Sequence, residues 1–299
     1  MQEQKKAYLL LHLSVFLWGF TAILGKLISI REVPLVWFRM MLTCGMMLFL
    51  PILWKAFKTL NKKNIAQLLG IGFLVCFHWL CFYGSIKYAN ASIALCCLAT
   101  TSLITSFLEP LINRSKLKKH EIFLGLLIIP AIGMVVYYTK FYFTGIILGL
   151  GAAFFASFFT ILNHKMVQKT NPVGMTFIEL LGGFLFLSLF LPLFFYLHPE
   201  AAFIPSQADW YYLFILSGAC TILPFIISLQ ALKHISAFAS VLTVNLEPVY
   251  GILLAIPFFH ENRELNPQFY IGTAIIIAIV FIHPFLDKKR EKEIVEIKN

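Results

Sequence analysis

The chain has 299 residues, of which 60% are hydrophobic and only 13% are charged. Soluble domains carry about 25% charged residues, so this composition excludes an ordinary soluble domain and predicts an integral membrane protein. The formal net charge is +10. Because the basic residues are unevenly distributed along the chain, we attribute this charge to membrane orientation and contact with anionic lipid, and not to nucleic-acid binding.

Apolar runs bounded by charge clusters and by Pro or Gly divide the chain into segments of membrane-crossing length. A helix needs about 20 apolar residues to cross a hydrocarbon core of about 30 Å. The runs lack the alternation of barrel strands, so helices are expected. We predict an all-α integral membrane protein with ten transmembrane helices, at Ala7–Ile28, Pro34–Leu53, Ala66–Ile86, Ala91–Leu111, Ile122–Tyr138, Phe143–Leu162, Pro172–Leu197, Trp210–Leu232, Ser236–Phe258 and Phe269–Phe285.

Basic residues are concentrated in alternate connections between these segments. With a cytoplasmic N-terminus, 18 of the 24 Lys and Arg residues lie on the cytoplasmic side, four lie outside, and Lys26 and Arg39 lie within segments. Positive charge is retained on the cytoplasmic side of a membrane. We therefore predict a multi-pass protein of the cytoplasmic (inner) membrane with both termini in the cytoplasm, residues 287–299 forming a cytoplasmic tail.

The sequence carries no signal for a bound metal or cofactor. All six cysteines fall within predicted segments without zinc-site spacing, and buried thiols behave as small apolar residues. We expect no disulfide, no metal and no cofactor. A GxxxxGK[ST] motif is absent, so ATP is not expected to drive the protein directly. The scattered histidines and the lack of HExxH and GxSxG motifs argue against an intramembrane lipid-modifying enzyme.

The two halves of the chain resemble each other. Lys87–Leu117 is similar to Lys233–Arg263 at a fixed offset, and each begins with a short hinge before a helix rich in small residues. Five segments per half is an odd number, so the second half is expected to be inverted. Inverted repeats are typical of transporters, with the substrate site near the midplane; a duplication kept only for structure is the alternative. We predict five-helix repeats at 7–138 and 143–286.

Several short motifs resemble those of a known family. They are Trp18-Gly19, Phe38-Arg39, Tyr88-Ala89-Asn90-Ala91-Ser92, Leu246-Glu247-Pro248 and His260-Glu261. Together with the length and the ten segments, they resemble the ten-helix EamA-type transporters of the drug/metabolite transporter superfamily over essentially the whole chain. One departure concerns the fourth segment, where family members often carry a proline and this chain has Thr101-Ser102.

The resemblance implies a secondary transporter, and more specifically an exporter, of small metabolites that works by alternating access. The expected partners are a small-molecule substrate and the lipid bilayer, with a proton or another ion as the candidate for coupling and no nucleic acid. A monomer and a homodimer are both compatible with the sequence. A passive metabolite channel is the alternative function, which uphill accumulation of substrate would exclude.

One carboxylate lies deep in the membrane beside a proline. Glu247 is 11 residues into the ninth segment, about 16 Å deep, where a charge costs about 2.5–3.5 kcal/mol. Pro248 has no N–H, so it leaves the Val244 carbonyl without its helical partner and kinks the helix. The repeat offset places Thr101 and Ser102 at the same depth, and we predict that both share a substrate cavity with Glu247. A packing kink with a buried, protonated Glu247 is the alternative.

Four further residues are candidates for substrate binding. Arg39 either extends to the lipid headgroups or lines the outer mouth of the cavity, where it would bind a carboxylate or phosphate. Glu179 is its rough repeat equivalent and would flank the substrate from the inner side. His78 either packs through a hydrogen bond or carries protons. Trp18 either stacks on substrate or fills space.

Overall fold

The computed structural model describes residues 2–135 and 142–251, and beyond these only 254, 267–268, 271–272, 274–279 and 282. The described residues form helices joined by turns, with no strand among them. The motif His260-Glu261, the tail 287–299 and eight residues of the tenth predicted segment, including both of its ends, lie outside the described residues. The elements are α1 (Gln2–Leu27), α2 (Glu32–Leu48), α3 (Pro51–Phe57), α4 (Lys62–Tyr88), α5 (Ala91–Ala99), α6 (Thr101–Asn113), α7 (Lys119–Val135), α8 (Phe143–Met166), α9 (Pro172–Leu197), α10 (Gln207–Ser217), the π-helical turn η1 (Gly218–Ile222), α11 (Leu223–Leu232) and α12 (Ala237–Val244).

The all-helical prediction is confirmed for the described part of the chain, whereas the count of ten crossings is not. Six spans there are long and apolar enough to cross a membrane, or seven if one bent pair is counted as a single span. The helices α1, α4, α8 and α9 each cover one predicted segment without interruption. The fifth predicted segment corresponds to α7, whose described part has 17 residues.

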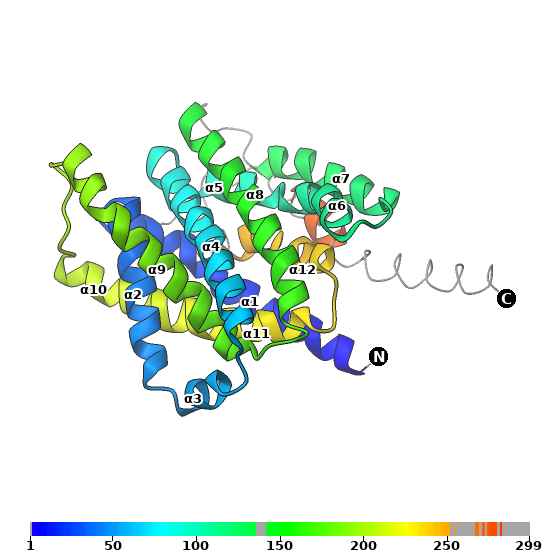
Figure 1. Ribbon diagram of the computed structural model, residues 1–299. Coiled ribbons are helices and arrows are strands. Elements are labelled where there is room, and N and C mark those ends of the chain that lie inside the picture. The colour runs from blue at the N-terminus through cyan, green and yellow to red at the C-terminus, as the bar shows by residue number, and fades with distance from the viewer. Residues whose placement is uncertain are drawn as a thin grey trace.

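The second predicted segment does not continue to Leu53 as expected. Its helix α2 ends at Leu48, and the chain turns by 90° into the short helix α3, which projects from one end of the bundle (Figure 1). Pro51 is the first residue of α3. A backbone N–H at this position has no hydrogen-bond acceptor within the helix, so proline, which lacks the N–H, is well tolerated there. Trp54 is exposed beside Lys55, a combination typical of the membrane–water interface.

Two predicted segments that were expected to be continuous helices are broken at equivalent places in the two halves. The fourth is interrupted at Thr100 between α5 and α6, and the ninth at Asn245 and Leu246, after which helix resumes at Glu247. Only the ninth has a proline next to the break. In the fourth segment, three consecutive hydroxyl side chains lie at the break, and each donates a hydrogen bond to the carbonyl three residues earlier. These residues are Thr100, Thr101 and Ser102. These bonds give the carbonyls around the break hydrogen-bond donors in a region away from water, in addition to the Thr100 N–H that bonds to the Cys97 and Leu98 carbonyls.

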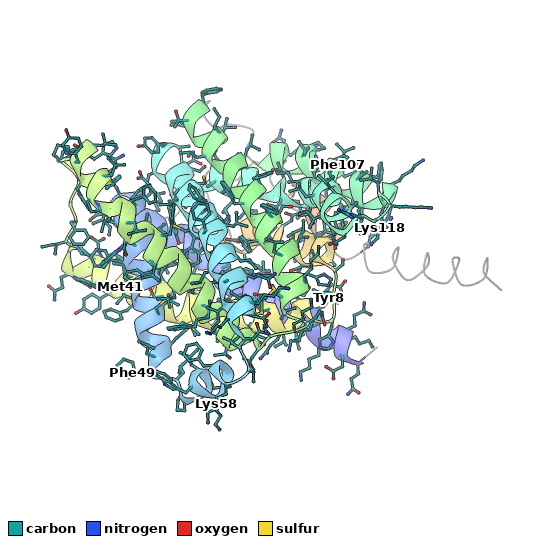
Figure 2. All side chains as sticks on the ribbon, viewed as in Figure 1. Tyr8, Met41, Phe49, Lys58, Phe107 and Lys118 are labelled. Carbon is teal, nitrogen blue, oxygen red and sulfur yellow. The ribbon has the colours of Figure 1, made fainter. Side chains whose placement is uncertain are left out.

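The helices pack around α4, which contacts α8 on one side and α9 on the other, while α1 lies along α11 (Figure 1). Close approach depends on glycine: a Cβ at Gly72 of α4 would collide with the Glu179 carbonyl oxygen of α9. Apolar side chains also cover the outside of the bundle (Figure 2). Leu111 is 74% exposed and Leu189 is 78% exposed, as expected of surfaces that contact lipid tails rather than water.

Candidate functional site

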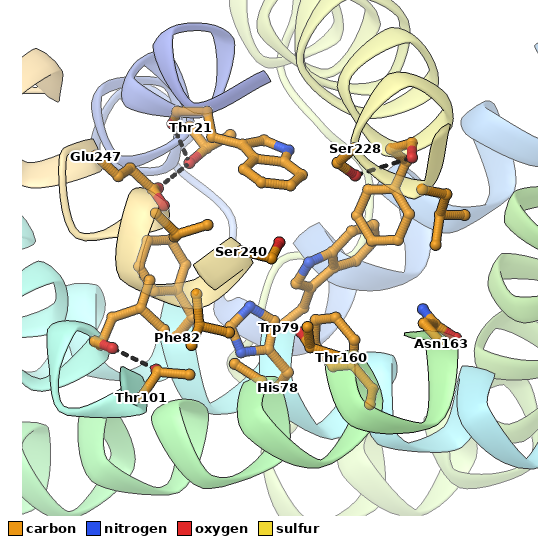
Figure 3. Close-up of a pocket in the computed structure, with 18 of the residues that line it drawn as sticks. Thr21, His78, Trp79, Phe82, Thr101, Thr160, Asn163, Ser228, Ser240 and Glu247 are labelled. Carbon is orange, nitrogen blue, oxygen red and sulfur yellow. Dashed lines mark hydrogen bonds between the residues drawn. The ribbon is translucent and has the colours of Figure 1, made fainter. Parts of the chain in front are cut away.

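A cavity lies inside the bundle, where helices of both halves meet (Figure 3). The volume of this cavity is about 110 Å³. Its walls come from α1, α2, α4, α5, α6, α8, α11 and α12, together with Glu247 after the second helix break. Five residues that the sequence singled out are among those that line it: Trp18, Arg39, His78, Thr101 and Glu247.

Two other predicted residues lie behind the cavity wall. Ser102 accepts a hydrogen bond from Asn245 Nδ2 at 3.1 Å, so it joins the two helix breaks to each other. Glu179 is fully buried and accepts a hydrogen bond from Asn163 Nδ2 at 3.2 Å. Asn163 lines the cavity, whereas Glu179 lies behind it. Pro248 is the second residue of the helix that resumes after the break, where a missing N–H is tolerated.

Arg39 is held inside the protein and does not extend to the headgroups, since it is only 2% exposed. Its Nε donates to Thr221 Oγ1 at 2.9 Å, and one Nη donates to the Tyr83 hydroxyl at 2.7 Å. The guanidinium carbon lies 3.7 Å from the centre of the Trp79 ring, a cation–π contact that is strong away from water. These partners are all neutral, and a guanidinium has five N–H donors. The positive charge is therefore available to an anionic group in the cavity.

The π-helical turn η1 helps to position this arginine. The Thr221 hydroxyl, within this turn, donates a hydrogen bond of 2.6 Å to the Leu216 carbonyl five residues earlier. The same Thr221 oxygen accepts the bond from Arg39, and the Cys220 carbonyl lies 3.5 Å from the second Nη. Turns of this kind are frequent at functional sites because they redirect backbone and side-chain groups. The eighth segment was predicted as a plain α-helix, and its pattern carries no signal for the turn.

The carboxyl group of Glu247 receives little hydrogen bonding from the protein. Thr21 Oγ1 lies 3.4 Å from Glu247 Oε1 but only 2.6 Å from the Trp18 carbonyl oxygen. A hydroxyl has one proton, and the shorter contact is much the better hydrogen bond. Glu247 is 5% exposed and lines the cavity. Its carboxyl group therefore faces the cavity, where it interacts electrostatically with Arg39 and can also bind a ligand.

Aromatic rings form much of the remaining wall. Trp18 and Trp79 both pack edge-on against Phe225, with ring centres 6.1 and 5.9 Å apart. His78 Nδ1 lies 2.9 Å from the Ala152 carbonyl oxygen; because a carbonyl only accepts, we assign the proton to Nδ1 and leave Nε2 as an acceptor. The cavity thus combines apolar rings with a few convergent polar groups, as small-molecule sites generally do.

Several lining residues were not predicted from the sequence. Figure 3 shows Thr21 beside Glu247 on one side of the cavity, with Thr160, Ser240 and Asn163 at other points of the wall. Hydroxyl residues are common in membrane helices, where they bond to their own backbone, so nothing in the sequence distinguished these. Asn163 could have been noticed as an amide at the end of the sixth predicted segment.

Polar contacts join the two halves at the end of the bundle that contains residues 28–31. Ser29 donates to Asp209 through its backbone N–H at 2.6 Å and its hydroxyl at 2.7 Å. Arg31 of the first half lies 3.3 Å from Glu200 of the second. Within the first half, Lys87 donates a hydrogen bond to the Ile28 carbonyl at the same end. Asp209 also forms the capping box of α10 with Ser206. Charge-assisted bonds of this kind are stronger than neutral ones, so this end of the bundle is firmly held together.

The cavity contains polar groups of several kinds. Among the described residues, no group of three or more His, Cys, Asp or Glu side chains is placed to hold a metal ion. The cavity brings together one guanidinium, one carboxyl, one imidazole and several hydroxyls. None of these is arranged as a nucleophile with an adjacent base, the pairing that covalent catalysis needs.

Comparison with known proteins assigns the chain to a family. The model of the EamA-like transporter family matches it twice, over residues 5–137 and 143–283. An uncharacterized transporter, YxxF, from Bacillus subtilis (strain 168) is 24% identical over 288 residues, covering 93% of this chain and 89% of the relative. A solved crystal structure shares the fold with a TM-score of 0.76 at 14% identity, covering 96% of this chain and 99% of the other. The chain belongs to the EamA-like transporter family of the drug/metabolite transporter superfamily, and is a multi-pass membrane transporter rather than an enzyme.

Proposed function

We propose that the protein is a secondary transporter that exports small metabolites by alternating access, with the substrate bound in the cavity between the two repeats. The observation that carries the proposal is the position of this cavity. It is lined by residues of both halves, and it lies beside the two equivalent helix breaks, at Thr100 and at Asn245–Leu246. Binding sites of inverted-repeat transporters are formed by discontinuous helices of this kind. Export is proposed from the family resemblance.

The lining supports a particular class of substrate. Arg39 offers N–H donors and a fixed positive charge that lacks a bonded carboxylate, and a planar guanidinium is well suited to a carboxylate or phosphate. Trp18, Trp79 and Phe225 offer apolar surface for the rest of the molecule. We propose an amphipathic metabolite that carries an anionic group, with that group at Arg39 and its apolar part between the rings.

Contacts at one end of the bundle support a carrier rather than an open channel. The distribution of Lys and Arg along the chain predicts that this end is external. Ser29 and Asp209 join the two halves there through two short hydrogen bonds. A passive channel needs a continuous path, whereas a carrier closes one end while the other is open. In our proposal these bonds close the outer end while the cavity is accessible from the cytoplasm.

The test is transport by purified protein reconstituted in liposomes. Pools of carboxylated and phosphorylated metabolites are loaded, and their movement is followed by mass spectrometry with and without an imposed pH gradient. We expect at least one anionic, amphipathic compound to accumulate against its own gradient. Movement only down the gradient, under every imposed ion gradient, would instead identify a channel.

The variant Glu247→Gln makes the test specific to the cavity. It keeps the size of the side chain but removes its charge, so folding should persist while the transport rate of the compound falls about tenfold or more, equivalent to about 1.4 kcal/mol. Glu200→Gln, at an exposed carboxylate outside the cavity, is the matched control and should transport normally. Equal rates for both variants at equal expression would remove Glu247 from the transport pathway.

A further inference from the structure

Two buried oxygen atoms in the described part of the chain have no hydrogen-bond partner, and they belong to two residues that contact each other. These atoms are Glu179 Oε1 and Asn163 Oδ1. The other ends of the same side chains are bonded, with Asn163 Nδ2 donating to Glu179 Oε2 at 3.2 Å. Buried polar atoms in proteins are nearly always paired. Two unpaired acceptors on two side chains that are already hydrogen-bonded to each other therefore call for a donor that both can use.

A single proton supplies that donor. With a proton on Oε1, Glu179 becomes a carboxylic acid whose O–H can donate to the Asn163 amide oxygen. The amide N–H already donates to the other carboxyl oxygen, so acid and amide would be joined by two hydrogen bonds in opposite directions. The terminal torsions of both side chains are soft, so the pairing needs no movement of α8 or α9. Protonation thus satisfies both atoms at once.

The surroundings of Glu179 provide no competing cation. It is fully buried, and its helix α9 packs against α2, α3, α4 and α11. Charged groups on these helices are engaged elsewhere or lie near helix ends: Arg39 on α2 bonds to Thr221 and Tyr83, and Lys55 is in the last turn of α3. The remaining titratable groups away from the ends of these helices are the neutral side chains Cys44, Cys76, His78, Cys81 and Tyr83, and α11 carries none. His164 and Lys165 of α8 follow Asn163 at its C-terminal end.

An ionised Glu179 would be costly in this environment. A buried carboxylate without a cation loses its hydration and regains little from one amide hydrogen bond. A sodium ion is a poor alternative, because hard cations are generally surrounded by about six oxygen ligands, and the pair offers two free oxygen atoms. A proton needs only one donor position and one acceptor.

We propose that Glu179 and Asn163 form a proton-binding site that is separate from the substrate cavity and linked to it through Asn163. The link is direct, since Asn163 lines the cavity while Glu179 lies behind it. Binding a proton fixes the orientation of the Asn163 amide, and losing it frees the amide oxygen to turn toward the cavity. A role in coupling transport to protons rests on the proposed function, whereas proton binding itself does not.

Infrared spectroscopy of the purified protein in lipid nanodiscs tests the site without any substrate. The carbonyl stretch of a protonated carboxyl group is followed between about pH 5 and about pH 9, in wild type, Glu179→Gln and Glu247→Gln. We expect a protonated-carboxyl band in wild type that disappears in Glu179→Gln and persists in Glu247→Gln. Gln at position 179 can form the same paired hydrogen bonds with Asn163, so the variant should fold.

A second variant tests the role of the amide. In Asn163→Ala the band should remain but shift in frequency, because the acid loses its hydrogen-bond acceptor. Replacing sodium by choline in the buffer should leave the band unchanged. A band that is unaffected by Glu179→Gln, or one that responds to sodium rather than to pH, would overturn the proposal. If the band behaves as expected but no compound is transported, the proton site stands and the proposed function fails.

Discussion

Arg39 and Glu247 occupy the same cavity but are stabilised in different ways. The arginine has neutral hydrogen-bond partners and an aromatic ring beneath it, so the fold supports its charge without a carboxylate. Glu247 accepts one weak hydrogen bond, from Thr21, and interacts electrostatically with Arg39. Both could be singled out from the sequence, because charged side chains inside a membrane are costly and usually functional. That both face the cavity rather than lipid depends on helix rotation, which the uniformly apolar sequence does not encode.

Replacing Arg39 by Lys tests whether the guanidinium shape matters as well as the charge. Lysine can reach either Thr221 or Tyr83 but not both with the same geometry, and it cannot stack flat on the Trp79 ring. We expect the transport rate for an anionic substrate to fall about tenfold, measured as initial uptake into liposomes and corresponding to about 1.4 kcal/mol.

The matched control is Arg31→Lys, since Arg31 is partly exposed and pairs with the exposed Glu200. A surface pair of this kind contributes about 0–1 kcal/mol, so this variant should transport nearly as well as wild type. An Arg39→Lys protein with unaltered transport would show that only a positive charge is needed there.

At the level of elements, long uninterrupted helices were predicted well and breaks were predicted poorly. The apolar runs of α1, α4, α8 and α9 are long enough to exclude other structures. The break at Thr100 has no proline or glycine, so the usual breaking signals were absent; it depends on hydroxyl-to-carbonyl bonds that are visible only in three dimensions. The turn after Leu48 was also missed, because apolar residues continue through it.

The contact between α4 and α9 depends on a glycine that can be tested directly. A Cβ at Gly72 would collide with the backbone carbonyl of Glu179, and α9 cannot move away without disturbing its other contacts. We expect Gly72→Ala to destabilise the protein by about 1–3 kcal/mol, as overpacking generally does, and to lower its midpoint of thermal unfolding in detergent.

The neighbouring Gly70 provides an internal control on the same helix, since no atom lies within 4 Å of the position that its Cβ would occupy. Alanine is the better helix former by about 1 kcal/mol, so Gly70→Ala should leave stability unchanged or slightly increased. Equal melting temperatures for the two variants would mean that α4 and α9 are not tightly packed at this point.

Across the whole molecule, the two halves are related by sequence but differ in their contacts. The helix breaks at Thr100 and at Asn245–Leu246 occur at equivalent positions in the two halves, although both segments were predicted as continuous helices. The bonds from Ser29 to Asp209 join the halves at one end of the bundle, and no repeat pattern could have predicted them because they connect non-equivalent residues. An unequal closure of the two ends is what alternating access requires.

Orientation in the membrane follows from the 18 basic residues on one side. We expect both termini to be cytoplasmic, so that a green fluorescent protein fused after Asn299 is fluorescent and an alkaline phosphatase fused there is inactive. A fusion at Glu200, in the connection between α9 and α10, should give the opposite pattern. An active phosphatase at Asn299 would reverse the assignment of the outer end.

The central claim is that the cavity is a pathway reached alternately from both sides of the membrane. Chemical labelling of Thr101→Cys, in a protein lacking its native cysteines, tests this claim most directly. A membrane-impermeant thiol reagent is applied to inverted and to right-side-out vesicles, with Ser102→Cys, which lies behind the wall, as the comparison. We predict that Thr101→Cys reacts from both sides and Ser102→Cys from neither. Weakening the outer closure with Asp209→Ala should increase labelling from outside and decrease it from inside. Labelling of Thr101→Cys from one side only, unchanged by Asp209→Ala, would contradict the account.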